Sequence, residues 1–165
     1  MKNITSAILI FFLLIVFTAN SNANSNKFRD ELPELQRLTD LSIAIRRINK
    51  GLKYEAKGKD KKANKMYTEA IDFLFEANKN QDIDPSIFFY LGFSFQKLKD
   101  FENAEIYYQL GLAIDPINSN INKYLGALYV NLKKLKLANE RLDVLKNCNC
   151  EEYLDLKNFI SENKF

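Results

Sequence analysis

Small residues recur at a constant interval in the second half of this chain. Gly92 and Gly126 lie 34 residues apart, and so do Ala104 and Ala138. A fixed period of between about 20 and 50 residues is typical of proteins that stack copies of one supersecondary unit. No segment shows sustained strand alternation between turn signals, so no sheet is expected. The interval therefore predicts a helical array.

One stretch carries the pattern most fully. The residues from Pro85 to Pro116 resemble a complete tetratricopeptide unit. The match consists of a Leu-Gly pair, an aromatic residue three positions on, a small residue, a second aromatic residue and a closing proline: Leu91, Gly92, Phe95, Ala104, Tyr108 and Pro116. Two positions differ, since Phe88 stands where the family often has Trp and Gly111 stands where it usually has Ala.

The following unit, residues 119–149, repeats the pattern and then departs from it. Leu125, Gly126 and Ala138 recur in register. Leu142 then replaces the second aromatic residue, and no proline closes the unit. We therefore expect the last packing surface of the array to differ.

An earlier unit matches through Gly51, Tyr54, Gly58, Ala63, Tyr67, Ala70 and Ile71. The next unit begins 41 residues later instead of 34. The extra residues amount to about two helical turns and predict a second helix extended through about Asn78. We reject the register that aligns Gly58 with Gly92, because it breaks the Ala-Tyr-Ala spacing.

The resemblance implies an all-α fold, a short tetratricopeptide-type helical solenoid of about three helix pairs plus a C-terminal capping helix. The expected divisions are a signal peptide (1–23), a flexible lead (24–33), a repeat domain (34–150, with units near 44–84, 85–118 and 119–150) and the capping helix (151–165). A terminal helix with one polar face is what a solenoid needs to close its exposed end.

Local signals place several helix ends. Asp84-Pro85 predicts an N-cap followed by proline at the first helical position. Asp115-Pro116 predicts the end of the preceding helix. An apolar stripe that starts at Leu35 predicts a helix from Glu34, either continuous or broken near Asp40.

The first residues are typical of an export signal. Lys2 supplies positive charge, an unbroken apolar run extends from Ala7 to Phe17, and small residues allow cleavage after Ala23. The run is shorter than the roughly 20 residues that a membrane span needs, so we expect no stable span after cleavage. Retention as an uncleaved anchor stays open. The expected location is the periplasm, with secretion as the alternative.

Composition argues against most chemistry. The chain has no histidine, which removes the commonest general base and the commonest metal ligand. We therefore expect no enzyme, no cofactor and no metal site. The formal net charge of +3 is too small to indicate a nucleic-acid partner. Basic residues cluster from Arg46 to Lys65, which we interpret as a solvated helix face.

The chain's two cysteines, Cys148 and Cys150, lie between the last repeat and the capping helix. Two cysteines without histidine do not complete a zinc site, which needs about four ligands. In an exported protein they predict a local disulfide or two packed thiols. An exchangeable redox pair or an intermolecular bridge is the alternative. The loop between them is short, so its closure should stabilise the fold only modestly.

The resemblance also implies a concave groove lined by the first helix of each pair. The expected groove residues are Phe89, Phe93, Gln96, Lys97, Lys123, Ala127 and Asn131, with Ile45, Ile48, Leu52, Glu55 and Ala56 in the first unit. Family members that capture acidic C-terminal peptides use Lys, Asn and Arg at such places. Here the positions in the first and middle units are mainly apolar or aromatic, and only Lys123 and Asn131 fit in the third unit. This favours an amphipathic helix or an extended apolar peptide. Alternatively, Phe89 and Phe93 belong to the core, or the N-terminal apolar stripe covers the groove.

These features predict a non-catalytic protein-binding adaptor or scaffold of the cell envelope. Its partner would be a protein or peptide. Two alternatives stay open: a thiol-redox accessory protein that uses Cys148 and Cys150, and a self-assembling structural repeat protein that forms a homo-oligomer.

Overall fold

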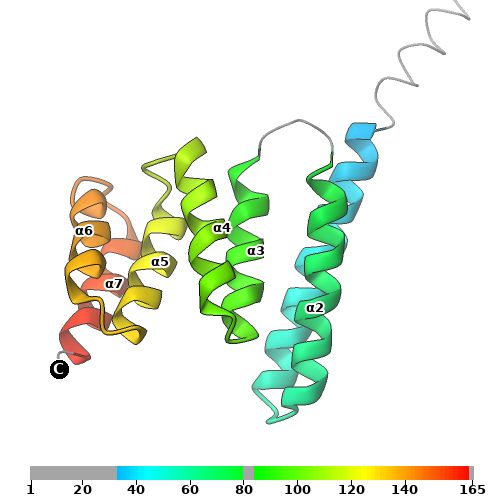
Figure 1. Ribbon diagram of the computed structural model, residues 1–165, viewed down its shortest axis with the longest axis horizontal. Helices are drawn as coiled ribbons and strands as arrows, with labels where there is room; N and C mark the ends of the chain where they lie inside the picture. Colours follow the sequence, from blue (N-terminus) through cyan, green and yellow to red (C-terminus); the bar gives the residue numbers. More distant parts are fainter. Residues whose placement is uncertain (1–32, 80–83, 164–165) are drawn as a thin grey trace, which may run out of the picture.

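The computed structural model describes residues 33–79 and 84–163, and it is helical almost throughout (Figure 1). The predicted signal peptide, and the predicted lead up to residue 32, lie outside the described residues. A first helix is described over residues 33–55. It is followed by α2 (Asp60–Ala77), α3 (Pro85–Lys97), α4 (Phe101–Ile114), α5 (Ser119–Asn131), α6 (Leu135–Leu145) and α7 (Glu151–Glu162). No strand occurs among the described residues. The predicted all-α solenoid of three helix pairs and a cap is confirmed.

The turns inside the helix pairs establish the repeat register. Gly58, Lys99 and Lys133 all have φ near +60° (63°, 64° and 60°) and lie in the turns that join the two helices of each pair. These residues are separated by 41 and then 34 positions, as the sequence register requires. Gly58 is thus the counterpart of Lys99 and not of Gly92. This confirms the register in which Gly51 aligns with Gly92. Glycine adopts this left-handed conformation without the steric cost that other residues incur.

The helix ends follow the predicted signals. Asp84 caps α3 by accepting a hydrogen bond from the Ser86 backbone N–H at 2.9 Å, and Pro85 opens the helix. Asp115 is the C-cap of α4. The α2 helix ends at Ala77 with Asn78 as its C-cap, close to the predicted end. It has 18 residues against 14 in α4, so it is longer by about one turn and not by the two that the interval predicted.

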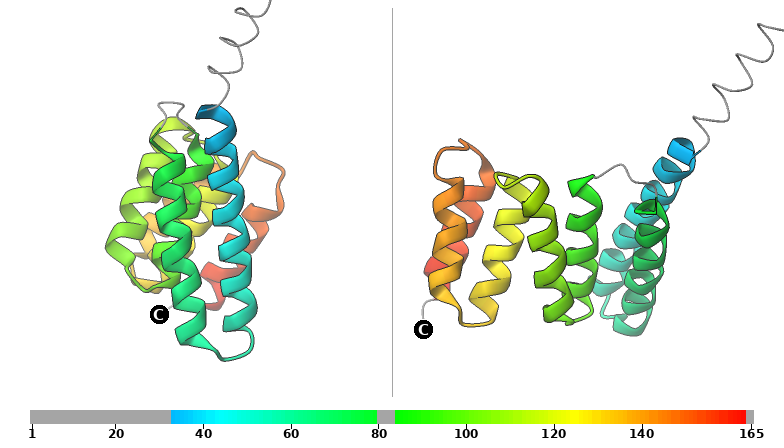
Figure 2. Two further views of the ribbon diagram at one scale, coloured as in Figure 1. Left: turned by 90° about the vertical axis from the view of Figure 1, so that its right-hand side faces the viewer. Right: turned by 45° about the horizontal axis from the view of Figure 1, so that its top comes forward.

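The first helix is continuous over residues 33–55, which settles the question of a break near Asp40. Leu35 and Leu38 are 59% and 48% exposed. This part of the apolar stripe therefore faces solvent and does not fill the groove. The helix pairs stand side by side in chain order, as Figure 2 shows from two further directions.

The repeat glycines allow each pair of helices to approach closely. A Cβ on Gly51 would lie 2.6 Å from the Tyr67 ring, and one on Gly92 would lie 2.6 Å from the Tyr108 ring. In the third pair, a Cβ on Gly126 would meet Leu156 of α7 at 2.6 Å instead. The expected difference in the last packing surface is thus explained, because the capping helix supplies the side chain that a tyrosine supplies in the first two pairs.

Arg37 connects the first helix to the start of α3. Its guanidinium donates to Glu34 at 2.6 and 2.8 Å and to the Asp84 carboxylate at 3.2 Å. Partial burial raises the pKa of Asp84, but the hydrogen bonds from Ser86 and Arg37 and the Arg37 charge outweigh it. The pKa of Asp84 therefore lies below its ordinary value of 3.8.

We expect Asp84→Asn to lower the free energy of unfolding by about 1 kcal/mol at neutral pH. Asn caps a helix about as well as Asp, so the loss isolates the charge pair with Arg37. A depressed folded-state pKa stabilises above the unfolded pKa and ceases to do so as pH falls through the folded one. The difference between the two proteins, measured by urea unfolding, should thus shrink below pH 4. Asp115→Asn, which removes no ion pair, is the control, and equal losses in both variants would contradict the assignment.

Candidate functional site

A hollow of about 470 Å³ opens where the first helix, α3 and α5 come together. Its lining combines aromatic and aliphatic side chains with amides and charges. The residues are Leu52, Glu55, Phe93, Gln96, Lys97, Lys99, Phe101, Tyr124 and Asn131. We call this feature the concave hollow. It lies where the resemblance placed the groove.

Aromatic rings from α3 and α5 form the apolar wall. The Phe93 and Tyr124 rings meet edge to face with centroids 5.5 Å apart, and Phe89 and Tyr124 do so at 5.3 Å. Phe89 also lies 6.4 Å from the fully buried Tyr108 ring and packs against the core of α4–α7. Of the two predicted phenylalanines, Phe93 therefore lines the concave hollow, whereas Phe89 supports the wall from behind.

A repeated hydrogen bond sets the polar floor. The Tyr67 hydroxyl donates to Glu55 at 2.8 Å, and the Tyr108 hydroxyl donates to Gln96 Oε1 at 2.8 Å. Glu55 and Gln96 occupy the same position of successive repeats, four residues after the repeat glycine. In the third repeat this position is Val130, which is buried. The hydrogen bond therefore orients one polar side chain in each of the first two repeats.

Glu55 links two repeats electrostatically. Lys97 donates to its carboxylate oxygens at 3.0 and 3.2 Å. Partial burial raises the pKa of Glu55, but the hydrogen bonds from Lys97 and Tyr67 and the Lys97 charge outweigh it, and the net shift is downward. Burial and the hydrogen bond to Glu55 raise the pKa of the Tyr67 hydroxyl. At neutral pH the floor thus carries a compensated Lys97–Glu55 pair.

The second predicted groove lysine is also paired. Lys123 reaches Asp155 of the capping helix at 3.1 Å, and its ammonium lies 5.1 Å from the Tyr124 ring centre. Neither Lys97 nor Lys123 therefore offers an uncompensated positive charge. A carboxylate that binds either of these two lysines would have to displace a carboxylate already present.

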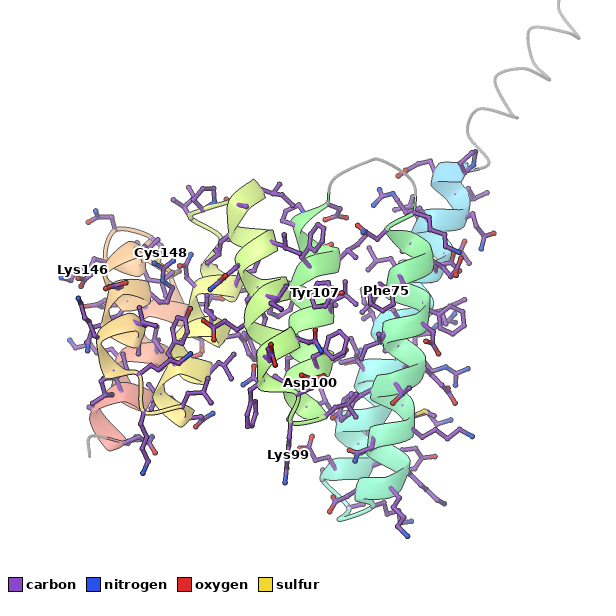
Figure 3. The ribbon with its side chains drawn as sticks, in the orientation of Figure 1. Phe75, Lys99, Asp100, Tyr107, Lys146 and Cys148 are labelled. Carbon is purple, nitrogen blue, oxygen red and sulfur yellow. A yellow bond between two sulfur atoms is a disulfide. The ribbon has the colours of Figure 1, made fainter. Side chains whose placement is uncertain are left out.

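The structure brings only some of the predicted site residues together. Those that line the concave hollow are Leu52, Glu55, Phe93, Gln96, Lys97 and Asn131. Phe89, Lys123 and Ala127 are half-buried nearby but do not line it. Sequence reasoning missed Lys99, Phe101 and Tyr124, because it considered only the groove positions that the resemblance supplies. Lys99 extends from the α3–α4 turn in Figure 3, beside Asp100.

Cys148 and Cys150 are joined in a disulfide between α6 and α7. Cys148, labelled in Figure 3, is exposed, and Cys150 is the N-cap residue of α7. The closed loop contains a single intervening residue, Asn149, with φ of 50°. A loop of this size contributes about 1.5 kcal/mol on the chain-entropy account. The disulfide thus fixes the turn into the cap at modest energetic benefit.

Within residues 33–79 and 84–163, no group of three or more histidine, cysteine, aspartate or glutamate side chains is arranged to hold a metal ion. No helix in the described part of the chain has both the length and the apolar character needed to cross a bilayer.

Comparison with known proteins bears on the fold. No family model matches the sequence, and no curated protein matches it. A solved structure, the first TPR domain of Spaghetti (RPAP3) bound to the HSP90 peptide SRMEEVD, matches with a TM-score of 0.52 and 26% identity over 74% of this chain and 93% of that one. The fold is a tetratricopeptide-repeat solenoid. In that neighbour the fold holds an HSP90 peptide.

Proposed function

We propose that this protein is a non-catalytic adaptor of the cell envelope whose concave hollow takes an apolar face of a partner. The observation that carries the proposal is the mixed lining of the hollow, in which Leu52, Phe93 and Tyr124 surround a compensated ion pair. Such a surface suits the apolar side of an amphipathic helix or an extended apolar peptide. Gln96 and Asn131 provide hydrogen bonds at its edge.

The neighbour's ligand, SRMEEVD, ends in acidic residues. In this chain an acidic peptide would meet Lys97 and, beside the hollow, Lys123, which Glu55 and Asp155 already neutralise. Lys99, in the α3–α4 turn, is the lining lysine without an ion pair among the described residues. It would also meet the aromatic wall, which offers no charge to a carboxylate. These contacts favour an apolar ligand over an acidic C-terminal one, although the scaffold is shared.

The test uses Phe93→Ser in capture experiments from envelope extract, followed by peptide mapping of the captured protein. Burying an aromatic anchor at the centre of an interface typically contributes about 2 kcal/mol or more, so affinity for the mapped peptide should fall about 30-fold. Phe75→Ser is the matched control, because Phe75 is 40% exposed on α2 and lies outside the concave hollow. Thermal melting of both variants separates lost binding from lost stability.

Three results would count against the proposal. If Phe93→Ser captures the partner as well as the wild type does, the concave hollow is not part of the interface. Displacement of the captured partner by the heptapeptide SRMEEVD would show that the concave hollow takes an acidic ligand instead of an apolar one. Recovery of the chain alone, with a mass that rises with concentration, would favour the self-assembling alternative.

A further inference from the structure

The outward face of the first helix carries a concentration of positive charge that the concave hollow does not use. Four cations lie on it, namely Arg46, Arg47, Lys50 and Lys53, and Lys57 follows in the turn after the helix. At about 100° per residue these four fall within an arc of about 120° on one side of the helix. The only carboxylate between residues 43 and 57 is Glu55, which lines the concave hollow and pairs with Lys97. We call this surface the basic face.

The adjoining helix α2 extends the basic face. A hollow of about 360 Å³ lies between the two helices, lined by Arg47, Lys50, Tyr54, Lys62, Lys65, Met66 and Glu69. The Lys50 and Lys62 ammonium groups each lie 5.9 Å from the centre of the Tyr54 ring. Cations from both helices therefore surround one aromatic floor. The two helices stand together at one end of the solenoid (Figures 1 and 2).

Few of these charges are compensated. Glu69 pairs with Arg47 at 3.2 Å and with Lys65 at 3.9 Å. Among the described residues, no carboxylate lies within ion-pair distance of the remaining cations, which are Arg46, Lys50, Lys53, Lys57 and Lys62. The basic face therefore presents a net positive field, although the whole chain carries only +3.

Solubility alone does not require a surface of one sign. The opposite end of the solenoid, α7, exposes charges of both signs: Glu151, Asp155, Lys157 and Glu162. Mixed charges suffice to keep a solenoid end soluble. On the first helix, Arg46 and Lys50 repel one another at a spacing of four residues, which destabilises a helix by a few tenths of a kcal/mol. The charges of the basic face therefore lower the stability of the helix that carries them.

We propose that the basic face binds an acidic, Asp/Glu-rich segment of another polypeptide. From Arg46 to Lys53 the helix cations form a row about 10 Å long, which an extended segment of about three residues matches in length, and Lys57 in the following turn continues the row. The inter-helix hollow receives carboxylate side chains between Lys50 and Lys62. Residues 43–69 contribute no exposed large hydrophobic side chain, so this surface has no apolar anchor for insertion into a bilayer. The binding is independent of the concave hollow.

The experiment measures fluorescence anisotropy of a labelled Glu-rich decapeptide with the full chain, and the same peptide with Gln for Glu is the neutral probe. We expect binding of the Glu-rich peptide only, weakening as salt rises because exposed charges are screened. Lys50→Glu/Lys53→Glu should weaken it about tenfold or more, since two exposed charge contacts of up to about 1 kcal/mol each are reversed.

The matched control is Lys136→Glu/Lys157→Glu. It changes the net charge equally at exposed positions, and Lys157 sits over Tyr153 at 5.7 Å much as Lys50 sits over Tyr54. We expect its affinity to stay within about twofold of wild type, apart from the weak long-range effect of net charge. Equal losses in both double variants, or no binding at all, would overturn the proposal. So would tighter binding to vesicles of phosphatidylglycerol and phosphatidylcholine, or to a single-stranded oligonucleotide, than to the peptide.

Discussion

Replacing Leu156 by Ala should lower the free energy of unfolding by about 3 kcal/mol. Leu156 is 1% exposed, and its two methyl groups occupy the space above Gly126 of α5. Truncating a buried leucine removes apolar burial and leaves a cavity, which together typically cost about 2–5 kcal/mol. Because the third helix pair has no tyrosine at this place, truncating Leu156 leaves a cavity above Gly126. Urea unfolding followed by circular dichroism measures the loss.

The same helix offers a matched control. Leu154 is 56% exposed, so Leu154→Ala should change stability by no more than about 0.5 kcal/mol. A double-mutant cycle then tests the contact itself. Gly126→Ala should destabilise the wild type but be neutral or stabilising in Leu156→Ala, where the new methyl group enters the cavity. Additive effects of the two substitutions would show that α7 does not close the solenoid through this contact.

The repeat register could be predicted because it depends on local residue types. Gly92 and Gly126 have to be small to admit a neighbouring side chain, and a 41-residue first interval is what an extended α2 requires. Asp84-Pro85 identified a helix start because capping involves only neighbouring residues. Each of these signals lies within one or two helical turns of the feature it determines.

The identity of the residue above Gly126 could not be predicted in the same way. The sequence showed that Leu142 replaces an aromatic residue, and hence that the last surface differs. It did not show that Leu156, thirty positions after the glycine, takes over the contact. That assignment depends on the angle at which α7 returns onto α5, which no local pattern specifies.

The sequence could predict residues of the candidate site only at positions that the repeat pattern defines. Phe93, Gln96 and Asn131 were found because they stand at fixed offsets from the repeat glycines. Lys99 comes from the α3–α4 turn and Phe101 begins α4, and both lie outside that pattern. The ion-pair partners of the lysines were missed as well, because Glu55 and Asp155 belong to other helices, 42 and 32 residues away. Their charges decide which ligand the groove favours.

A second large effect is expected at Gly92, where two physical tendencies oppose each other. Glycine inside a helix costs about 1 kcal/mol relative to alanine, so propensity alone predicts that Gly92→Ala stabilises the protein. The structure predicts the opposite sign. A Cβ at this position would lie 2.6 Å from two ring carbons of Tyr108, whose side chain is fully buried and hydrogen-bonded to Gln96. The ring therefore has little freedom to move aside.

We expect Gly92→Ala to destabilise by about 1–2 kcal/mol and Gly92→Val by about 3 kcal/mol, because overpacking a dense core typically costs about 1–3 kcal/mol and increases with added volume. Ala113→Val, on the exposed side of α4, controls for the helix propensity of valine, which amounts to about 0.5 kcal/mol. Thermal and urea unfolding of the three variants give the order of stability. A stabilised Gly92→Ala would contradict the close approach of α3 to Tyr108, and with it the reason that glycine recurs once in every repeat.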